Sequence, residues 1–113
     1  MFDRARLSRM KPSAYLVNTA RGGIVDERAL HNVLAEGSIA GAALDVFERE
    51  PTPLDNPLFG LKNLIVSPHV AGVTFEALER MSVATVRNLL DVLDGKPQLE
   101  NVVNPEVLDS IRS

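Results

Sequence analysis

Residues 14–46 read AYLVNTARGGIVDERALHNVLAEGSIAGAALDV, and this stretch decides the fold. The apolar run from Ala14 to Asn18 is followed by the glycine pair Gly22-Gly23, which indicates a buried strand that ends in a tight turn. The run from Ile39 to Val46 is nearly all apolar and contains four small residues. Such a run is typical of a strand that is covered on both faces.

A helix is predicted between these two strands. Asp26 is a good N-cap, the apolar side chains of Glu27 to Glu36 recur at helical spacing, and Gly37 suits the position just after the last turn. A strand, a helix and a strand in roughly thirty residues form one βαβ unit. Such a unit is right-handed and its strands are parallel.

Further elements flank this unit. Met1 to Met10 predicts a short helix with Asp3 as its N-cap, and Leu64 to Val66 predicts a third strand. Thr74 can cap a long helix from about Phe75 to about Leu93. We therefore expect an α/β fold in a single domain, residues 1–113, with a parallel sheet of about three strands, a long C-terminal helix and a tail over residues 97–113.

The long helix is apolar around most of its circumference. One apolar stripe contains Met81, Ala84, Thr85, Leu89 and Val92. The other contains Val83, Val86, Leu90 and Leu93. A helix of this kind requires cover on several sides, and the other predicted elements are too few to give it. We expect that the chain either oligomerises through this helix or is part of something larger.

Composition and charge exclude several classes of function. The chain has 113 residues, of which 45% are hydrophobic and 24% charged, as in an ordinary globular domain. A net charge of -3 and scattered basic residues argue against nucleic acid and anionic membranes as partners. The lack of cysteine excludes a disulfide and a thiol nucleophile, and two histidines are too few for a multi-histidine metal site. Neither a membrane span nor a signal peptide is visible, so we expect a cytoplasmic protein.

Four polar residues follow the three predicted strands. Arg21 follows the first, Asp45 ends the second with Glu50 beyond it, and His69 follows the third. The carboxyl ends of parallel strands meet at one edge of a sheet, where α/β proteins bind ligands. An arginine can hold a carboxylate, a histidine can move a proton, and an acid can fix the histidine's tautomer. Taken singly, Arg21 fits a surface ion pair equally well, His69 an ordinary turn residue, and Glu50 a solvated charge.

Three segments resemble successive signatures of a known family. They are NTARGGIVDERAL (18–30), GAALDVFEREP (41–51) and NLIVSPHVAGVTFEA (63–77). In order and spacing they are similar to the NAD-dependent D-isomer-specific 2-hydroxyacid dehydrogenases, which include phosphoglycerate, glycerate, formate and D-lactate dehydrogenases. The resemblance implies a partial Rossmann-like sheet in which residues 1–96 form the C-terminal half of a dinucleotide-binding domain. The implied reaction transfers a hydride between a nicotinamide and a 2-hydroxy or 2-keto acid.

The same resemblance implies a role for each residue that matches. Arg21 would bind the substrate carboxylate, His69 would be the general acid and base, and Glu50 would be its carboxylate partner. Asp45 would face the nicotinamide carboxamide. The remaining cofactor contacts implied by the resemblance come from Thr19, Ala20, Arg21, His69, Ala71 and Gly72.

Some of the family's features do not occur in this sequence. No Gly-x-Gly-x-x-Gly motif is present, and neither is the family's substrate domain. We therefore expect weak binding of NAD or NADP, a chain that is inert alone, and a homodimer. The choice between NAD and NADP and the identity of the 2-hydroxy acid stay open. The alternative is a non-catalytic, dimerising interaction module derived from this family, either co-repressor-like or a degenerate remnant.

Overall fold

The computed structural model describes residues 1–108 of the chain. It contains two compact units, of which the first is Met1–Gly72 and the second begins at Val73. The sequence predicts a single domain over residues 1–113, and whether the two units act as one domain stays a prediction. Residues 109–113 of the predicted tail lie outside the described residues.

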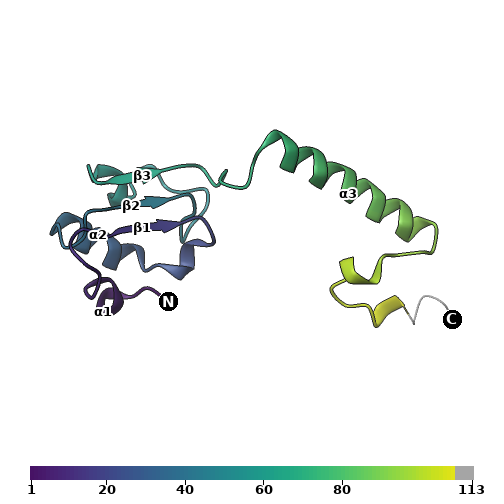
Figure 1. Ribbon diagram of the computed structural model, residues 1–113, viewed down its shortest axis with the longest axis horizontal. Helices are drawn as coiled ribbons and strands as arrows, with labels where there is room; N and C mark the ends of the chain where they lie inside the picture. Colours follow the sequence, from purple (N-terminus) through teal and green to yellow (C-terminus); the bar gives the residue numbers. More distant parts are fainter. Residues whose placement is uncertain (109–113) are drawn as a thin grey trace. The chain divides into compact units, whose positions relative to one another are not determined.

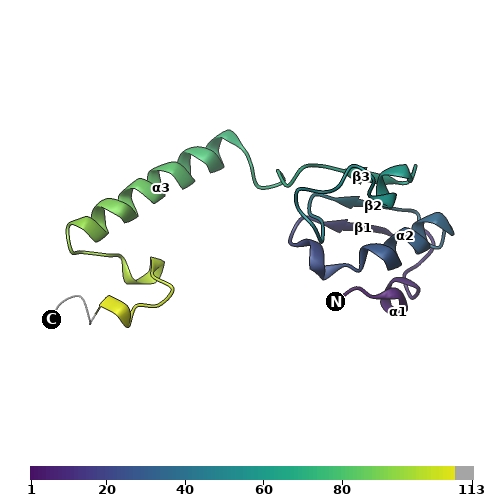
Figure 2. The same cartoon turned by 180° about the vertical axis from the view of Figure 1, so that it is seen from behind.

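The first unit is built on a parallel sheet of three strands, as the sequence predicts. Its strands are β1 (Tyr15–Asn18), β2 (Gly41–Leu44) and β3 (Leu64–Val66), in the order β1-β2-β3. Figures 1 and 2 show β2 between its two neighbours. β2 is shorter than the predicted Ile39 to Val46, because its partner strands offer only four and three paired positions.

The second and third helices begin and end within a residue of the predicted positions, whereas the first has only four residues within the predicted 1–10. They are α1 (Arg4–Leu7), α2 (Glu27–Ala35) and α3 (Phe75–Leu93), with single 3-10 turns at η1 (Gly22–Ile24), η2 (Pro57–Gly60) and η3 (Leu99–Asn101). Each predicted N-cap accepts a hydrogen bond from a backbone N–H of the first turn: Asp3 from Arg6, Asp26 from Ala29, and Thr74 from Ala77. Gly37 follows α2 with φ 66°, a left-handed conformation in which glycine carries no steric penalty.

The core of the first unit lies between α2 and one face of the sheet. Its buried side chains are Leu7, Leu16, Val25, Ala29, Leu30, Val33, Leu34, Ile39, Ala42, Leu44, Phe47 and Leu58. The opposite face is open within residues 1–72, because Tyr15, Val17 and Ile65 are 73%, 67% and 74% exposed. Within residues 1–72, the second strand is therefore covered on one face and not on both as the sequence predicts. The single crossover helix of a βαβ unit can cover only one face.

The second unit consists of α3 and the chain that follows it. No residue of α3 is buried, and its exposed apolar side chains include Met81, Val86 and Leu89. The second unit by itself therefore leaves the apolar sides of α3 uncovered, and oligomerisation through this helix stays a prediction. Among residues 1–108, no helix is long and apolar enough to cross a membrane.

Candidate active site

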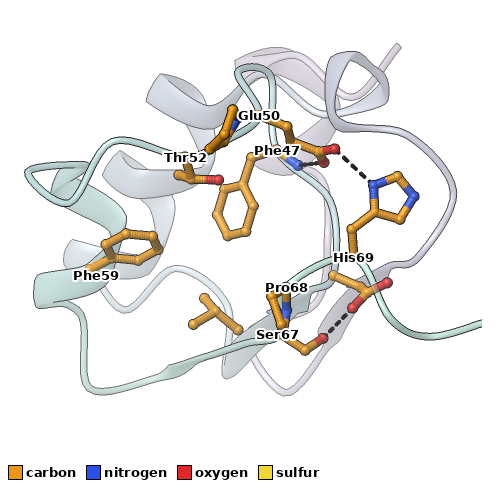
Figure 3. Close-up of a pocket in the computed structure, with 10 residues that line it drawn as sticks. Phe47, Glu50, Thr52, Phe59, Ser67, Pro68 and His69 are labelled. Carbon is orange, nitrogen blue, oxygen red and sulfur yellow. Dashed lines mark hydrogen bonds and ion pairs between the residues drawn. The ribbon is translucent and has the colours of Figure 1, made fainter. Parts of the chain in front are cut away.

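Glu50 and His69 lie together at the carboxyl ends of the strands. His69 Nδ1 is 2.8 Å from Glu50 Oε2, and both side chains are partly open to solvent. Figure 3 shows the carboxylate on one side of the imidazole ring. The other ring nitrogen, Nε2, has no partner within residues 1–108. The loops after β2 and β3 therefore bring together two of the residues that the sequence predicts.

The second oxygen of Glu50 is held by its own loop. Glu50 Oε1 accepts a hydrogen bond of 2.9 Å from the backbone N–H of Phe47. This bond is the main cause that lowers the pKa of Glu50, followed by the hydrogen bond to His69 and by the positive charges of His69 and Arg21. Glu50 therefore stays ionised and can hold a protonated imidazole at Nδ1.

Asp45 is the buried acid of the site, 3% exposed. Its Oδ1 accepts hydrogen bonds from Ser67 Oγ (2.5 Å) and Val70 N (2.9 Å), and its Oδ2 accepts one from Ala71 N (2.8 Å). The pKa of Asp45 is lowered, chiefly by the hydrogen bond from Ser67 and then by the two backbone donors. Its carboxylate is therefore charged and turned toward the chain around His69.

Arg21 lies in the turn after β1, immediately before η1, and its side chain is exposed. Its Nη1 donates to the carbonyl of Ala20 at 2.6 Å. Within the described residues Arg21 has no direct hydrogen bond to Glu50 or His69, although its charge contributes to the lowered pKa of Glu50. Its charge therefore acts on Glu50, and within residues 1–108 its guanidinium nitrogens other than Nη1 have no hydrogen-bond partner that would compete with an anion.

The turn that carries Arg21 is fixed by two neighbours. Asn18 is 6% exposed; its Nδ2 donates to the carbonyl of Arg21 at 2.9 Å, and its Oδ1 accepts from Ala20 N at 3.1 Å. Gly22 packs so closely on the next loop that a Cβ there would lie 1.9 Å from the carbonyl oxygen of Phe47. Contact between these two backbones joins the loop of Arg21 to the loop of Glu50.

The other predicted cofactor contacts lie in two short exposed segments. Thr19 and Ala20 belong to the turn after β1, and Ala71 and Gly72 follow His69. The N–H of Ala71 already donates to Asp45. These segments lie next to Arg21 and His69 along the chain, and their role as cofactor contacts stays a prediction. They do not include a glycine-rich turn at the start of a long helix, which a pyrophosphate needs.

An open pocket of about 630 Å³ lies beside the histidine–carboxylate pair (Figure 3). Its walls are mainly apolar and are formed by Asp45, Phe47, Glu50, Pro51, Thr52, Phe59, Val66, Ser67, Pro68 and His69. The rings of Phe47 and Phe59 pack edge to face, with centroids 5.7 Å apart. No group of three or more potential metal ligands gathers in residues 1–108.

The sequence does not predict the residues that hold the loops of the site in place by hydrogen bonds. Asn18 and Ser67 hold the turns of Arg21 and His69, and Glu27 and Glu48 each accept the backbone N–H of the other. A buried amide just after a strand, and a serine before a proline, are the signals that were available in the sequence. The reciprocal glutamates pair over twenty-one positions, and no local pattern marks them.

The arrangement can do acid–base chemistry on a bound anion. A carboxylate fixes one nitrogen of His69 and leaves Nε2 to exchange a proton, which histidine can do near neutral pH. Arg21 offers a planar, permanently charged donor group that suits a carboxylate.

Comparisons with known proteins show the family of the chain. Residues 1–71 match the family model of the D-isomer specific 2-hydroxyacid dehydrogenase, NAD binding domain. The chain is 51% identical over 110 residues to a glyoxylate reductase from Thermofilum pendens, a match that covers 96% of this chain and 32% of that protein. The chain thus spans about a third of the length of the curated relatives it matches.

Two solved structures are similar to this one. An NAD-dependent formate dehydrogenase from Staphylococcus aureus in complex with NAD has a TM-score of 0.79 and 38% identity, over 86% of this chain and 29% of that one. An NADPH-dependent glyoxylate/hydroxypyruvate reductase from Sinorhizobium meliloti, in complex with NADP and malonate, has a TM-score of 0.72 and 40% identity. The match covers 79% of this chain and 28% of that one. The chain belongs to the D-isomer-specific 2-hydroxyacid dehydrogenase family, and its residues 1–71 match the NAD-binding domain of that family.

Proposed function

We propose that this chain supplies the catalytic edge of an NAD(P)-dependent D-2-hydroxyacid dehydrogenase, and that its substrate is a small 2-hydroxy or 2-keto acid. The observation that carries the proposal is the contact of 2.8 Å between His69 Nδ1 and Glu50. The charge of the exposed Arg21 acts on the same carboxylate. Glyoxylate is the first candidate substrate, because glyoxylate reductases are among the chain's relatives.

Each polar residue has a separate role in the proposed reaction. Arg21 binds the substrate carboxylate and orients the neighbouring C2 oxygen. Glu50 holds Nδ1 of His69, so that Nε2 faces the substrate and takes up or returns the hydroxyl proton. Phe47 N fixes Glu50 in turn, which keeps the imidazole in one orientation.

The nicotinamide, when bound, supplies or accepts the hydride. Thr19, Ala20, Arg21, His69, Ala71 and Gly72 would line its ring, and Asp45 has one acceptor position left for the carboxamide, since three of about four are used by Ser67, Val70 and Ala71. These residues fit the nicotinamide end of a dinucleotide only. We therefore expect weak affinity for NAD or NADP and no measurable turnover by this chain alone.

NMR spectra recorded while glyoxylate and NADH are added test the proposal on the chain as it exists. Adding glyoxylate together with NADH should shift the backbone amide signals of Thr19, Arg21, His69 and Ala71. Arg21→Ala should weaken glyoxylate binding about tenfold or more, as expected for the loss of a charge-assisted pair. The matched control is Arg28→Ala, which removes an exposed arginine of α2 and should leave binding unchanged.

Three results would contradict the proposal. Equal glyoxylate affinity of the Arg21→Ala and Arg28→Ala variants would remove Arg21 from the site. Shifts confined to residues outside the strand-end loops would place binding elsewhere. Oxidation of NADH by the chain alone, in the presence of glyoxylate, would show that it is not inert.

A second candidate function is that of a dimerising interaction module without catalysis. The exposed apolar residues on α3 favour it, because no residue of that helix is buried. We expect a homodimer, which sedimentation at micromolar concentration should detect; a monodisperse monomer would refute this. A cytoplasmic location likewise stays a prediction.

A further inference from the structure

His69 has a backbone conformation that few residues other than glycine adopt. Its φ is 56°, in the left-handed region. A conformation of this kind costs a residue with a Cβ on the order of 1 kcal/mol and persists only where the surroundings enforce it. The structure therefore needs a group that holds the turn around His69.

Asp45 is placed to be that group. It accepts backbone hydrogen bonds from Val70 and Ala71, the two residues after His69, and a side-chain hydrogen bond from Ser67, two residues before it. All three donors flank the strained residue, and the carboxylate that receives them is buried.

The sheet fixes Asp45 itself. Its backbone N–H donates to the carbonyl of Asn18 on β1 at 3.0 Å, and the N–H of Ser67 donates to the carbonyl of Leu44 on β2, also at 3.0 Å. The turn of His69 is therefore tied to two strands through Asp45 and Ser67. The direction that this turn gives to the imidazole places Nδ1 on Glu50.

We propose that Asp45 and Ser67 are positioning residues, which hold His69 in its left-handed conformation and thereby aim its imidazole at Glu50. Asp45 acts through the two backbone donors, and Ser67 acts by orienting the carboxylate of Asp45. This role rests on the proposed function, in which His69 moves the proton, and it is separate from any contact of Asp45 with a cofactor.

The hydrogen bond from Ser67 has a second, measurable effect. It is the largest cause that lowers the pKa of Asp45, ahead of the donors Ala71 and Val70 and the charge of His69. Removing the hydroxyl should therefore raise the pKa of Asp45 and loosen the turn at the same time. A residue with a purely structural role in the core would not move this pKa.

Four variants of the 113-residue chain test the proposal: Ser67→Ala, Ser67→Thr, Asp45→Asn and Ser38→Ala. The last is the matched control, because Ser38 also donates to a carboxylate, that of Glu36, but lies at the far end of α2. Nitrogen-15 NMR of the imidazole reports the hydrogen bond at His69 Nδ1, with His31 on α2 as internal reference. Carbon-13 titration of the side-chain carboxylates reports the pKa of Asp45.

We expect Asp45→Asn to lose the hydrogen-bonded Nδ1 signal of His69 while the amide signals of β2 are kept. Ser67→Ala should weaken that signal and raise the pKa of Asp45. Ser67→Thr keeps the hydroxyl and should show the signal and the pKa of the unsubstituted chain, and Ser38→Ala should change neither. If Asp45→Asn does not fold, the comparison of Ser67→Ala with Ser67→Thr tests the proposal by itself.

An unchanged His69 signal in Ser67→Ala would overturn the proposal, as would a Ser67→Thr variant that behaves like Ser67→Ala. No ligand is added in this experiment. It can therefore fail while glyoxylate still binds at Arg21, and it can succeed while the proposed function fails.

Discussion

Gly22 joins the two loops that carry Arg21 and Glu50, and adding one methyl group there should separate them. A Cβ on Gly22 would lie 1.9 Å from the carbonyl oxygen of Phe47, 2.0 Å from its carbonyl carbon and 2.5 Å from Glu48 N. All three atoms belong to backbone, so no side chain can rotate out of the way. Because ordinary contact starts at 3.4 Å, the loops would have to move apart by roughly 1.5 Å.

This displacement reaches the core. Phe47 is 8% exposed and belongs to the buried cluster on the covered face of the sheet. Overpacking of a buried site usually costs about 1–3 kcal/mol, and a backbone clash lies at the upper end, so we expect Gly22→Ala to lower the free energy of unfolding by about 3 kcal/mol. With a urea dependence of about 1.5 kcal/mol per molar, the unfolding midpoint should fall by about 2 M.

Urea unfolding followed through the amide signals of β2 measures this for the first unit alone. Gly23→Ala is the matched control, because a Cβ on Gly23 meets nothing within 4 Å. That variant should stay within about 0.5 kcal/mol of the unsubstituted chain or be slightly more stable, since alanine restricts the unfolded state. Equal midpoints for the two alanine variants would refute the close approach at Gly22.

Three further predictions concern stability. Asp26→Ala removes the cap that accepts from Ala29 N at 2.8 Å and should cost about 1 kcal/mol in the same urea assay. Gly37→Ala, at φ 66°, should cost about 1 kcal/mol although nothing lies within 4 Å, whereas Gly60→Ala should be neutral; similar losses in both would contradict the conformational reason. The pKa of Glu50 is lowered from its usual 4.5, so its contribution to stability is present above that pH and is lost as the pH falls through the folded-state pKa. Glu50→Gln should therefore lose less stability than the unsubstituted chain between about pH 6 and pH 3, and parallel pH profiles would argue against this.

The sequence predicts the periodic parts of the fold well, because their signals are local. The caps Asp26 and Thr74 and the glycine at 37 mark helix ends that the structure places within a residue or two of the prediction. The parallel order of the strands follows from the βαβ connection. The open face of the sheet in residues 1–72 was missed, because an apolar strand indicates that cover is needed and not which part of a protein supplies it.

The sequence predicts which residues of the candidate site lie together, but not which hydrogen bonds hold them in place. The ends of parallel strands bring Glu50 and His69 to one edge by topology alone. The orientation of His69 depends on a positive φ and on a carboxylate twenty-four positions earlier, and neither follows from a local pattern. Hydrogen bonds between distant backbone donors and buried acids are visible only once the chain is folded.

Carboxylates that accept backbone N–H groups hold this site together from within the first unit. Asp45 accepts hydrogen bonds from the backbone N–H groups of Val70 and Ala71, and Glu50 accepts one from the backbone N–H of Phe47. Because each of these partners lies in residues 1–72, the geometry of His69 and Glu50 does not require any contact from outside that unit. If the chain proves inert, as we propose, the cause we expect is weak binding of cofactor and substrate, and not a misplaced acid–base pair. The His69 imidazole signal separates these two explanations, since it should report an intact Nδ1 hydrogen bond in a chain that turns over no glyoxylate.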